Sequence, residues 1–217
     1  MAEMNIPFKL PNANNLGRHT DVMFAIAAVM VIMMLIIPLP TFVLDLLLVI
    51  NIIISLLILL MVLSIKSAND FSVFPSVLLV MTAFRLALNV STTRAILSQG
   101  ASFDGRVITA FANFVVAGNV VVGVVIFIIL IIVQFVVITR GATRVSEVAA
   151  RFALDSMPSK MMAVESELQA GAITDKEAED KRKKIRGESD FYGTMDGASK
   201  FVQGDVIAGL IITVINI

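Results

Sequence analysis

Apolar runs long enough to cross a lipid bilayer dominate the first 138 residues, and they constrain the fold more than any other feature. A transmembrane helix needs about 20 apolar residues, and inside the bilayer only helices or closed barrels satisfy the backbone. Charged residues make up 16% of the 217 residues, whereas soluble domains contain about 25%. The sequence therefore predicts an all-α, polytopic helical membrane protein with spans at about 22–39, 42–65, 71–90 and 107–138.

The fourth of these runs is too long for one upright helix. Residues 107–138 would form a helix of about 48 Å, which exceeds the hydrocarbon core of about 30 Å. The run must therefore tilt, project from the bilayer or break. Gly118 and Gly123 are the expected weak points.

A charged region follows the apolar one. Of the 17 Lys and Arg residues, 11 fall between Arg140 and Lys200. We expect a small helical subdomain at 139–199, in which Pro158 opens a helix that Gly171 ends. Thr174 and Glu177 form a T-x-x-E capping box for the next helix. Its basic cluster at 181–184 fits either a solvated face or a contact with anionic lipid.

The distribution of Lys and Arg predicts the orientation. Positive residues near span ends favour the cytoplasmic side; the leader, 1–21, contains Lys9 and Arg18, and the insert, 139–199, contains ten Lys and Arg residues. We therefore expect both segments to be cytoplasmic. Residues 200–217 would then begin a fifth span, too short as it stands to cross a bilayer. We expect the chain to be the N-terminal portion of a longer protein.

The fifth apolar segment contains one acid, Asp205. On a helix of 100° per residue, Gly209, Thr213 and Asn216 lie within about 80° of it, so they form one polar stripe. Gly204 precedes the acid and, with Gly209, would permit close backbone approach or local bending of the helix. Polar groups in hydrocarbon are costly and usually face a bundle interior or a water-filled path. A polar contact between helices is the alternative.

Three further charges lie in or beside the spans. Asp45 is near the start of the second span, where an acid is favoured by the helix dipole as a capping carboxylate. Arg85 and Arg94 suggest pairing with an acid or with backbone carbonyls, and snorkelling to the interface is the simpler interpretation for Arg94.

Several functional classes are disfavoured. Cys is absent and His19 is the single histidine, so there is no thiolate chemistry and no evident metal or cofactor site. No phosphate-binding loop is present, and an enzyme or a nucleic-acid-binding protein is not expected. Solute transporters usually contain internal repeats, and the first four spans show none.

Three long motifs identify a family resemblance. RLALNVSTTR (85–94), FALDSMPSKMMAVESELQAG (152–171) and DFYGTMDGASKFVQGDVIAGLIITVINI (190–217) closely resemble the FlhA/SctV, or FHIPEP, family. These are large export-gate subunits of flagellar and virulence type III secretion systems. The flagellar branch is the more similar. Ser159 and Gln203 depart mildly from the family pattern.

The resemblance implies a bacterial inner-membrane protein of about eight spans that assembles into a nonameric ring. The implied partners are the narrower export-gate subunits, a cytoplasmic ATPase complex and exported proteins. It further implies that proton flow is coupled to export, with candidate coupling residues at Asp205, Lys200, Arg94 and Asp155. The virulence homologue and a purely structural ring remain alternatives.

Burial gives Asp205 a chemical rationale that is independent of the family. A carboxyl in a low-dielectric site has its charged form disfavoured, so it can load and release a proton as its surroundings alternate. We expect Lys200 and the insert to be the nearest influences on this acid. Arg85 and Arg94 are expected toward the opposite membrane face.

Overall fold

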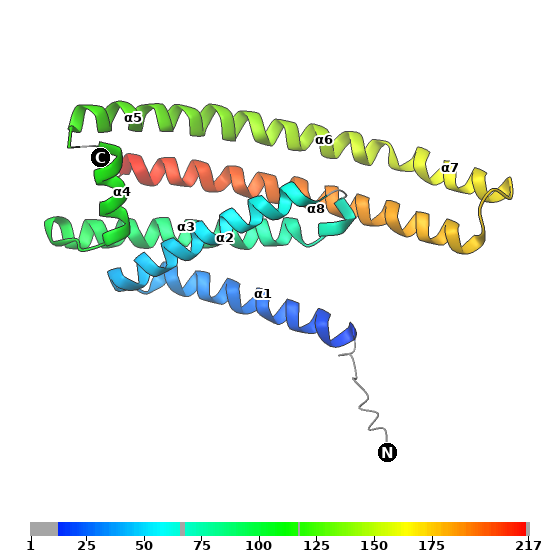
Figure 1. Ribbon diagram of the computed structural model, residues 1–217, viewed down its shortest axis with the longest axis horizontal. Coiled ribbons are helices and arrows are strands. Elements are labelled where there is room, and N and C mark those ends of the chain that lie inside the picture. Colours follow the sequence, from blue (N-terminus) through cyan, green and yellow to red (C-terminus); the bar gives the residue numbers. More distant parts are fainter. Residues whose placement is uncertain (1–12, 66–67, 117, 216–217) are drawn as a thin grey trace, which may run out of the picture.

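The computed structural model describes residues 13–65, 68–116 and 118–215 of the chain. Within these residues every regular element is helical, so the predicted all-α class is confirmed (Figure 1). Helices α1 (Ala13–Ile36) and α2 (Thr41–Ser64) are joined by the turn that contains Pro38 and Pro40. The next elements are η1 (Ala68–Phe71), α3 (Phe74–Gln99), η2 (Gly100–Ser102), α4 (Arg106–Val116) and α5 (Val120–Val133). The last are η3 (Gln134–Ala142), α6 (Thr143–Asp155), α7 (Met157–Gln169) and α8 (Asp175–Ile215).

A small apolar core joins α1 to α3. Val31 and Met34 of α1 pack against Ala87 and Leu88 of α3, and all four side chains are buried. Elsewhere along the apolar helices most large hydrophobic side chains are exposed on this chain. Helices that are apolar on all sides are typical of membrane spans, whose outer surface faces lipid or neighbouring chains.

Four helices in the described part of the chain are long and apolar enough to cross a membrane. They cover Thr41–Ser64, Phe74–Ser102, Val120–Val137 and part of Asp175–Ile215. In α1, the described apolar stretch is shorter, Ala25–Ile36. These helices make the protein a polytopic α-helical membrane protein, as the sequence predicts.

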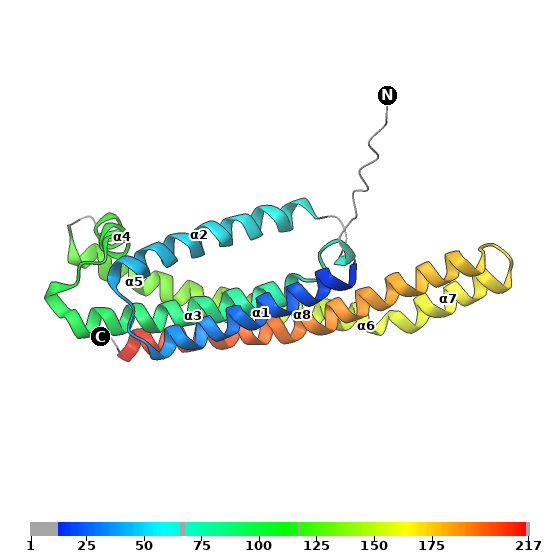
Figure 2. The same cartoon turned by 90° about the horizontal axis from the view of Figure 1, so that it is seen from below.

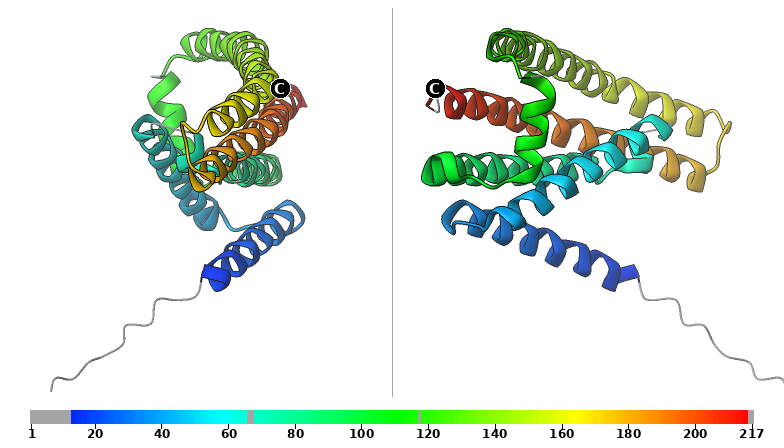
Figure 3. Two further views of the ribbon diagram at one scale, coloured as in Figure 1. Left: turned by 90° about the vertical axis from the view of Figure 1, so that its right-hand side faces the viewer. Right: turned by 60° about the vertical axis from the view of Figure 1, so that its left-hand side comes forward.

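The fourth apolar run breaks at one of the two predicted glycines. Gly118 has φ of 76°, a left-handed conformation that glycine adopts at little cost. Asn119 then caps α5 by accepting the N–H of Val121 at 3.0 Å. Helix α4 runs steeply across the other helices (Figures 1 and 3). The single span predicted over 107–138 is therefore two helices, and Gly123 lies inside α5 rather than at a break.

The charged region is a helical hairpin that extends directly from the spans. A π-helical segment, η3, carries α5 into α6 and α7, and α8 returns antiparallel to them (Figures 1 and 2). Helix α8 has 41 residues, a length of about 60 Å. It contains both the third helix of the insert and the fifth apolar segment, so no helix boundary separates 139–199 from 200–217.

The hairpin turn has the predicted chemistry. Gly171 has φ of 69° and ends α7. The N–H of Ala172 reaches the carbonyl of Glu167 at 2.9 Å, as in a Schellman motif. Glu177 accepts the Thr174 N–H at 2.8 Å and the Thr174 hydroxyl at 2.9 Å. The predicted terminator and the predicted capping box are both confirmed.

Ion pairs join the two arms of the hairpin. Lys160 of α7 contacts Glu188 of α8 at 2.7 Å. In the basic cluster of α8, Lys181 contacts Glu167, and Arg182 contacts Glu165. In these ion pairs the side chains of Lys181 and Arg182 remain 45% and 33% exposed, as expected for the solvated face, one of the two alternatives left open by the sequence.

Candidate functional site

Asp205 lies in the part of α8 that packs against α3. The residue is 8% exposed, and its Oδ1 atom is buried with no hydrogen-bond partner among the described residues. A buried polar atom without a partner costs free energy, and native proteins rarely retain one without a reason. Among the described residues, Asp205 is therefore the clearest candidate for a functional residue.

Among the described charged residues, Arg85 is the one whose positive charge acts on the Asp205 carboxyl. It lies near the middle of α3, and it forms no ion pair with Asp205 within 4 Å. The expectation that Lys200 and the insert are the nearest influences is therefore wrong. Lys200 instead bonds to Asp196, one turn earlier, at 2.6 Å. The error arose because the sequence does not show that α3 brings Arg85 alongside α8.

The polar stripe beyond Asp205 lines a cavity. Gly209 and Thr213 form one wall, and the Thr213 hydroxyl donates to the Gly209 carbonyl at 2.8 Å. Gly204 is exposed and does not line this cavity. A Cβ atom at Gly204 or Gly209 would meet no atom within 4 Å, so the close approach predicted there does not occur within this chain. Asn216, the last predicted member of the stripe, lies outside the described residues.

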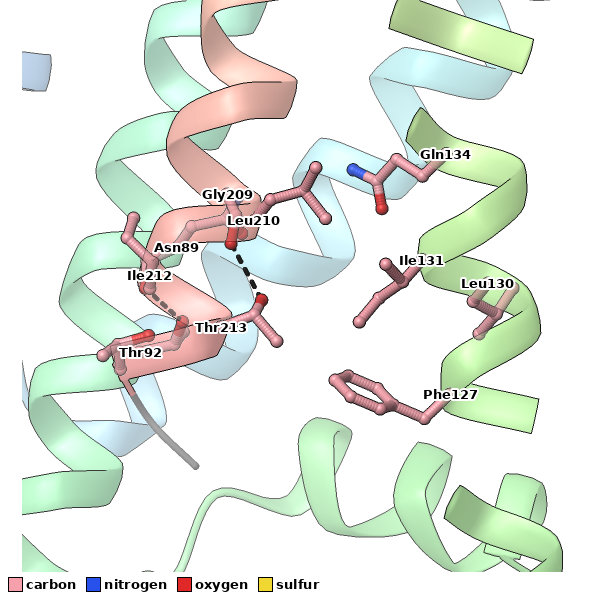
Figure 4. A pocket seen from close by; sticks show the side chains of 11 residues that line it. Asn89, Thr92, Phe127, Leu130, Ile131, Gln134, Gly209, Leu210, Ile212 and Thr213 are labelled. Carbon is pink, nitrogen blue, oxygen red and sulfur yellow. Dashed lines mark hydrogen bonds between the residues drawn. The ribbon is translucent and has the colours of Figure 1, made fainter. Parts of the chain in front are cut away.

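The cavity has a volume of about 380 Å³ and lies between α3, α5, η3 and α8. Figure 4 shows the Gln134 side chain pointing from the opposite wall toward α8. Asn89 and Thr92 add polar groups from α3, while Phe127 and Ile131 add apolar surface from α5. Sequence reasoning did not assign Gln134 or Thr92 a role. An amide at the end of a long apolar run was the available signal for Gln134.

Arg94 binds the carboxyl end of α1. Its guanidinium donates to the carbonyls of Leu35 and Ile36, the latter at 3.0 Å. Ser91, one turn earlier on α3, donates to the carbonyl of Met34 at 2.8 Å. The last carbonyls of a helix have no partner inside it. Of the two interpretations, the structure thus favours pairing with backbone carbonyls over snorkelling.

Asp45 and Asp155 lie apart from Asp205. The Asp45 carboxylate accepts the N–H groups of Arg106 and Val107, the first residues of α4. It caps α4 rather than its own helix. Asp155 ends α6 with its side chain 70% exposed, 3.8 Å from Arg151. Of the four candidate coupling residues, the structure thus places only Asp205 at the polar stripe. Within the described ranges no three His, Asp or Glu side chains come together as a metal site.

Comparison with known proteins identifies the family. Residues 31–217 match the FHIPEP family. The chain belongs to the FHIPEP family. This confirms the resemblance carried by the three motifs, and it makes the chain a multi-pass protein of the bacterial inner membrane.

Relatives within the FHIPEP family include flagellar and non-flagellar proteins. The chain is 57% identical to flagellar biosynthesis protein FlhA of Bacillus subtilis (strain 168) over 197 residues, 91% of this chain and 29% of that protein. It is 46% identical to flagellar biosynthesis protein FlhA of Salmonella typhimurium over 220 residues, 100% of this chain and 32% of that protein.

The low calcium response locus protein D of Yersinia pestis is 50% identical over 211 residues, 97% of this chain and 30% of that protein. The chain thus spans about 30% of the length of these FHIPEP relatives. No solved structure matches it.

Proposed function

We propose that this chain is part of the membrane export gate of a flagellar type III secretion apparatus and couples proton movement to the export of unfolded flagellar subunits. The observation that carries the proposal is the buried side chain of Asp205, whose Oδ1 has no hydrogen-bond partner among the described residues, on a helix that continues into the charged hairpin. The names of the flagellar relatives support the flagellar branch.

The continuous helix α8 supplies a mechanical link. Protonation neutralises the Asp205 carboxyl, and so changes its attraction to Arg85 of α3 and the cost of its burial. Packing between α8 and α3 then favours a different arrangement. Because α8 has no break between Asp205 and its start at Asp175, a shift at the acid moves the arm of the hairpin.

The membrane topology is part of the proposal. Residues 1–21 and 139–199 face the cytoplasm, 22–138 form four spans, and 200–217 begin a fifth. The ten Lys and Arg residues of the insert, together with Lys9 and Arg18 of the leader, support this orientation. The partners are further copies of the chain in a nonameric ring, the narrower gate subunits, the cytoplasmic ATPase complex and the exported proteins.

A chimera tests the flagellar assignment. Residues 1–217 replace the aligned region of the Bacillus subtilis relative, in a strain that lacks its own copy. We expect secretion of filament protein and motility to return. Asp205→Asn in the same chimera should abolish both while the chimera still reaches the membrane in normal amount.

Two outcomes favour the alternatives. If Asp205→Asn lowers assembly in proportion to secretion, the polar stripe serves a structural ring. If the flagellar chimera fails but the equivalent Yersinia chimera secretes, the virulence branch is correct. The observation that favours a role in virulence secretion as the second candidate function is the 50% identity to the Yersinia protein.

A further inference from the structure

Two cavities of similar size lie among the spans, and their linings differ in kind. The cavity between α1, α2 and α3, of about 460 Å³, is lined by apolar side chains alone, Val80 and Met81 among them. The cavity beside α8, of about 380 Å³, has side-chain amides and hydroxyls on its walls. This contrast within one apolar helical bundle indicates that the two cavities differ in what they contain.

The polar cavity has the groups that hold water. The side-chain amides of Asn89 and Gln134 bond to no other described residue. The hydroxyls of Thr92 and Thr213 donate to carbonyls of their own helices, so their oxygen atoms remain free to accept. Water needs two to four polar partners, and a cavity of about 380 Å³ has room for several water molecules. Apolar cavities stay dry.

The cavity also approaches Asp205. Gly209 is one turn beyond the acid, about 6 Å along the axis, and it forms part of the cavity wall. A Cβ atom at Gly209 would project into open space. The absence of a side chain therefore keeps this end of the cavity wide.

We infer that the cavity between α3, α5, η3 and α8 is a hydrated vestibule that brings water, and hydronium with it, to within one helical turn of Asp205. A hydronium ion there gives a proton to the carboxylate and is left as water. The use of that proton in export rests on the proposed function, whereas the hydration of the cavity does not.

Cysteine labelling tests the hydration directly, because residues 1–217 contain no Cys, and any Cys elsewhere in the complete protein is first replaced by Ser. In the complete protein in membranes, Thr213→Cys and Gln134→Cys are treated with a charged methanethiosulfonate reagent. Val214→Cys is the matched control, since Val214 is adjacent, apolar and 69% exposed on the outside of the chain. Val80→Cys samples the apolar cavity.

Thiolates form and react in water rather than in hydrocarbon. The thiols of Thr213→Cys and Gln134→Cys should therefore react at least about tenfold faster than that of either control variant. A second variant, Gly209→Leu, fills the cavity, and it should reduce the reaction of Thr213→Cys to the control rate. Gly204→Leu, which does not line the cavity, should leave it unchanged. Reaction of Thr213→Cys no faster than that of Val214→Cys overturns the inference. So does a reaction that Gly209→Leu leaves unaffected.

The labelling experiment tests the hydrated vestibule and the secretion experiment tests the proposed coupling, so either hypothesis can be rejected without the other. If Thr213→Cys reacts while Asp205→Asn secretes normally, the vestibule stands and the proposed coupling falls. If Thr213→Cys stays unreactive while Asp205→Asn blocks secretion, the coupling stands, and the acid receives its proton by another route.

Discussion

The carboxylate of Asp45 in α2 accepts the backbone N–H of Arg106, the first residue of α4, at 2.8 Å. A second bond from the N–H of Val107, at 3.1 Å, completes the cap. The first N–H groups of a helix have no partner within it. A side chain 61 residues away in sequence thus fixes where the steeply crossing helix α4 begins.

Asp45→Ala should loosen the start of α4. Loss of a capping side chain costs about 1 kcal/mol, which thermal unfolding in detergent will detect. Hydrogen exchange should quicken at the amides of Arg106 and Val107. Asp45→Asn keeps one acceptor oxygen, so it should cost less than half as much. Equal losses for the two variants would show that charge, and not the cap, matters at this position.

Arg94→Ala should free the end of α1. Hydrogen bonds from a charged donor contribute about 2 kcal/mol, and here two of them reach the carbonyls of Leu35 and Ile36. We expect a loss of this size in the free energy of unfolding, and a partial loss for Arg94→Lys, because a point-like ammonium lacks the guanidinium fork.

Secretion by the Arg94 variants separates positioning from proton coupling. If Arg94 acts by holding α1, secretion falls in amount and its dependence on external pH keeps its shape. A shifted pH profile with unchanged stability would instead assign Arg94 to the coupling step.

The hairpin should respond to charge exchange. Arg182→Glu places a like charge beside Glu165 and should destabilise the hairpin by about 0.5 kcal/mol, since both side chains are partly exposed. Adding Glu165→Arg restores an opposite pair and should recover most of this loss. Both effects should shrink in high salt. Thermal unfolding of the three proteins provides the comparison, and failure of the double variant to recover would count against the α7–α8 pairing.

The start of α8 should weaken in acid. Hydrogen bonds from the backbone N–H and then the hydroxyl of Thr174 lower the pKa of Glu177 below its usual value. A folded-state pKa below the unfolded one stabilises the fold above the unfolded pKa, and this stabilisation disappears as the pH falls through the folded pKa. The melting difference between wild type and Glu177→Gln should therefore be present at neutral pH and vanish in acid.

Glu179→Gln is the control for this titration, because Glu179 is an exposed neighbour without a bond to Thr174. It should show no such acid-dependent difference. A Glu177→Gln difference that persists at low pH would mean that the capping box acts without its charge.

Features decided by neighbouring residues were predictable from the sequence. Gly118 and Gly171 adopt positive φ values, and Thr174 with Glu177 forms the capping box, because each depends on a few adjacent residues. The acid of the fifth apolar segment also stood out, since a lone carboxyl in hydrocarbon is costly wherever it lies.

Features decided by which helices lie side by side were not predictable. The position of Arg85 relative to Asp205, the cap from Asp45 to α4 and the bonds from Arg94 to α1 all join residues distant in sequence. Periodicity gives the face of a helix but not its neighbour. The cavity was missed for the same reason, because its polar groups come from α3, η3 and α8.

Coupling of proton movement to export through protonation of Asp205 can be tested by measuring secretion as a function of the proton-motive force. The chimera is compared with its Asp205→Asn and Asp205→Glu variants at equal amounts of assembled protein. We expect secretion to rise with the proton-motive force in the parent chimera, to rise less in Asp205→Glu, and not to rise in Asp205→Asn. An Asp205→Asn variant whose secretion follows the proton-motive force as the parent does would contradict it.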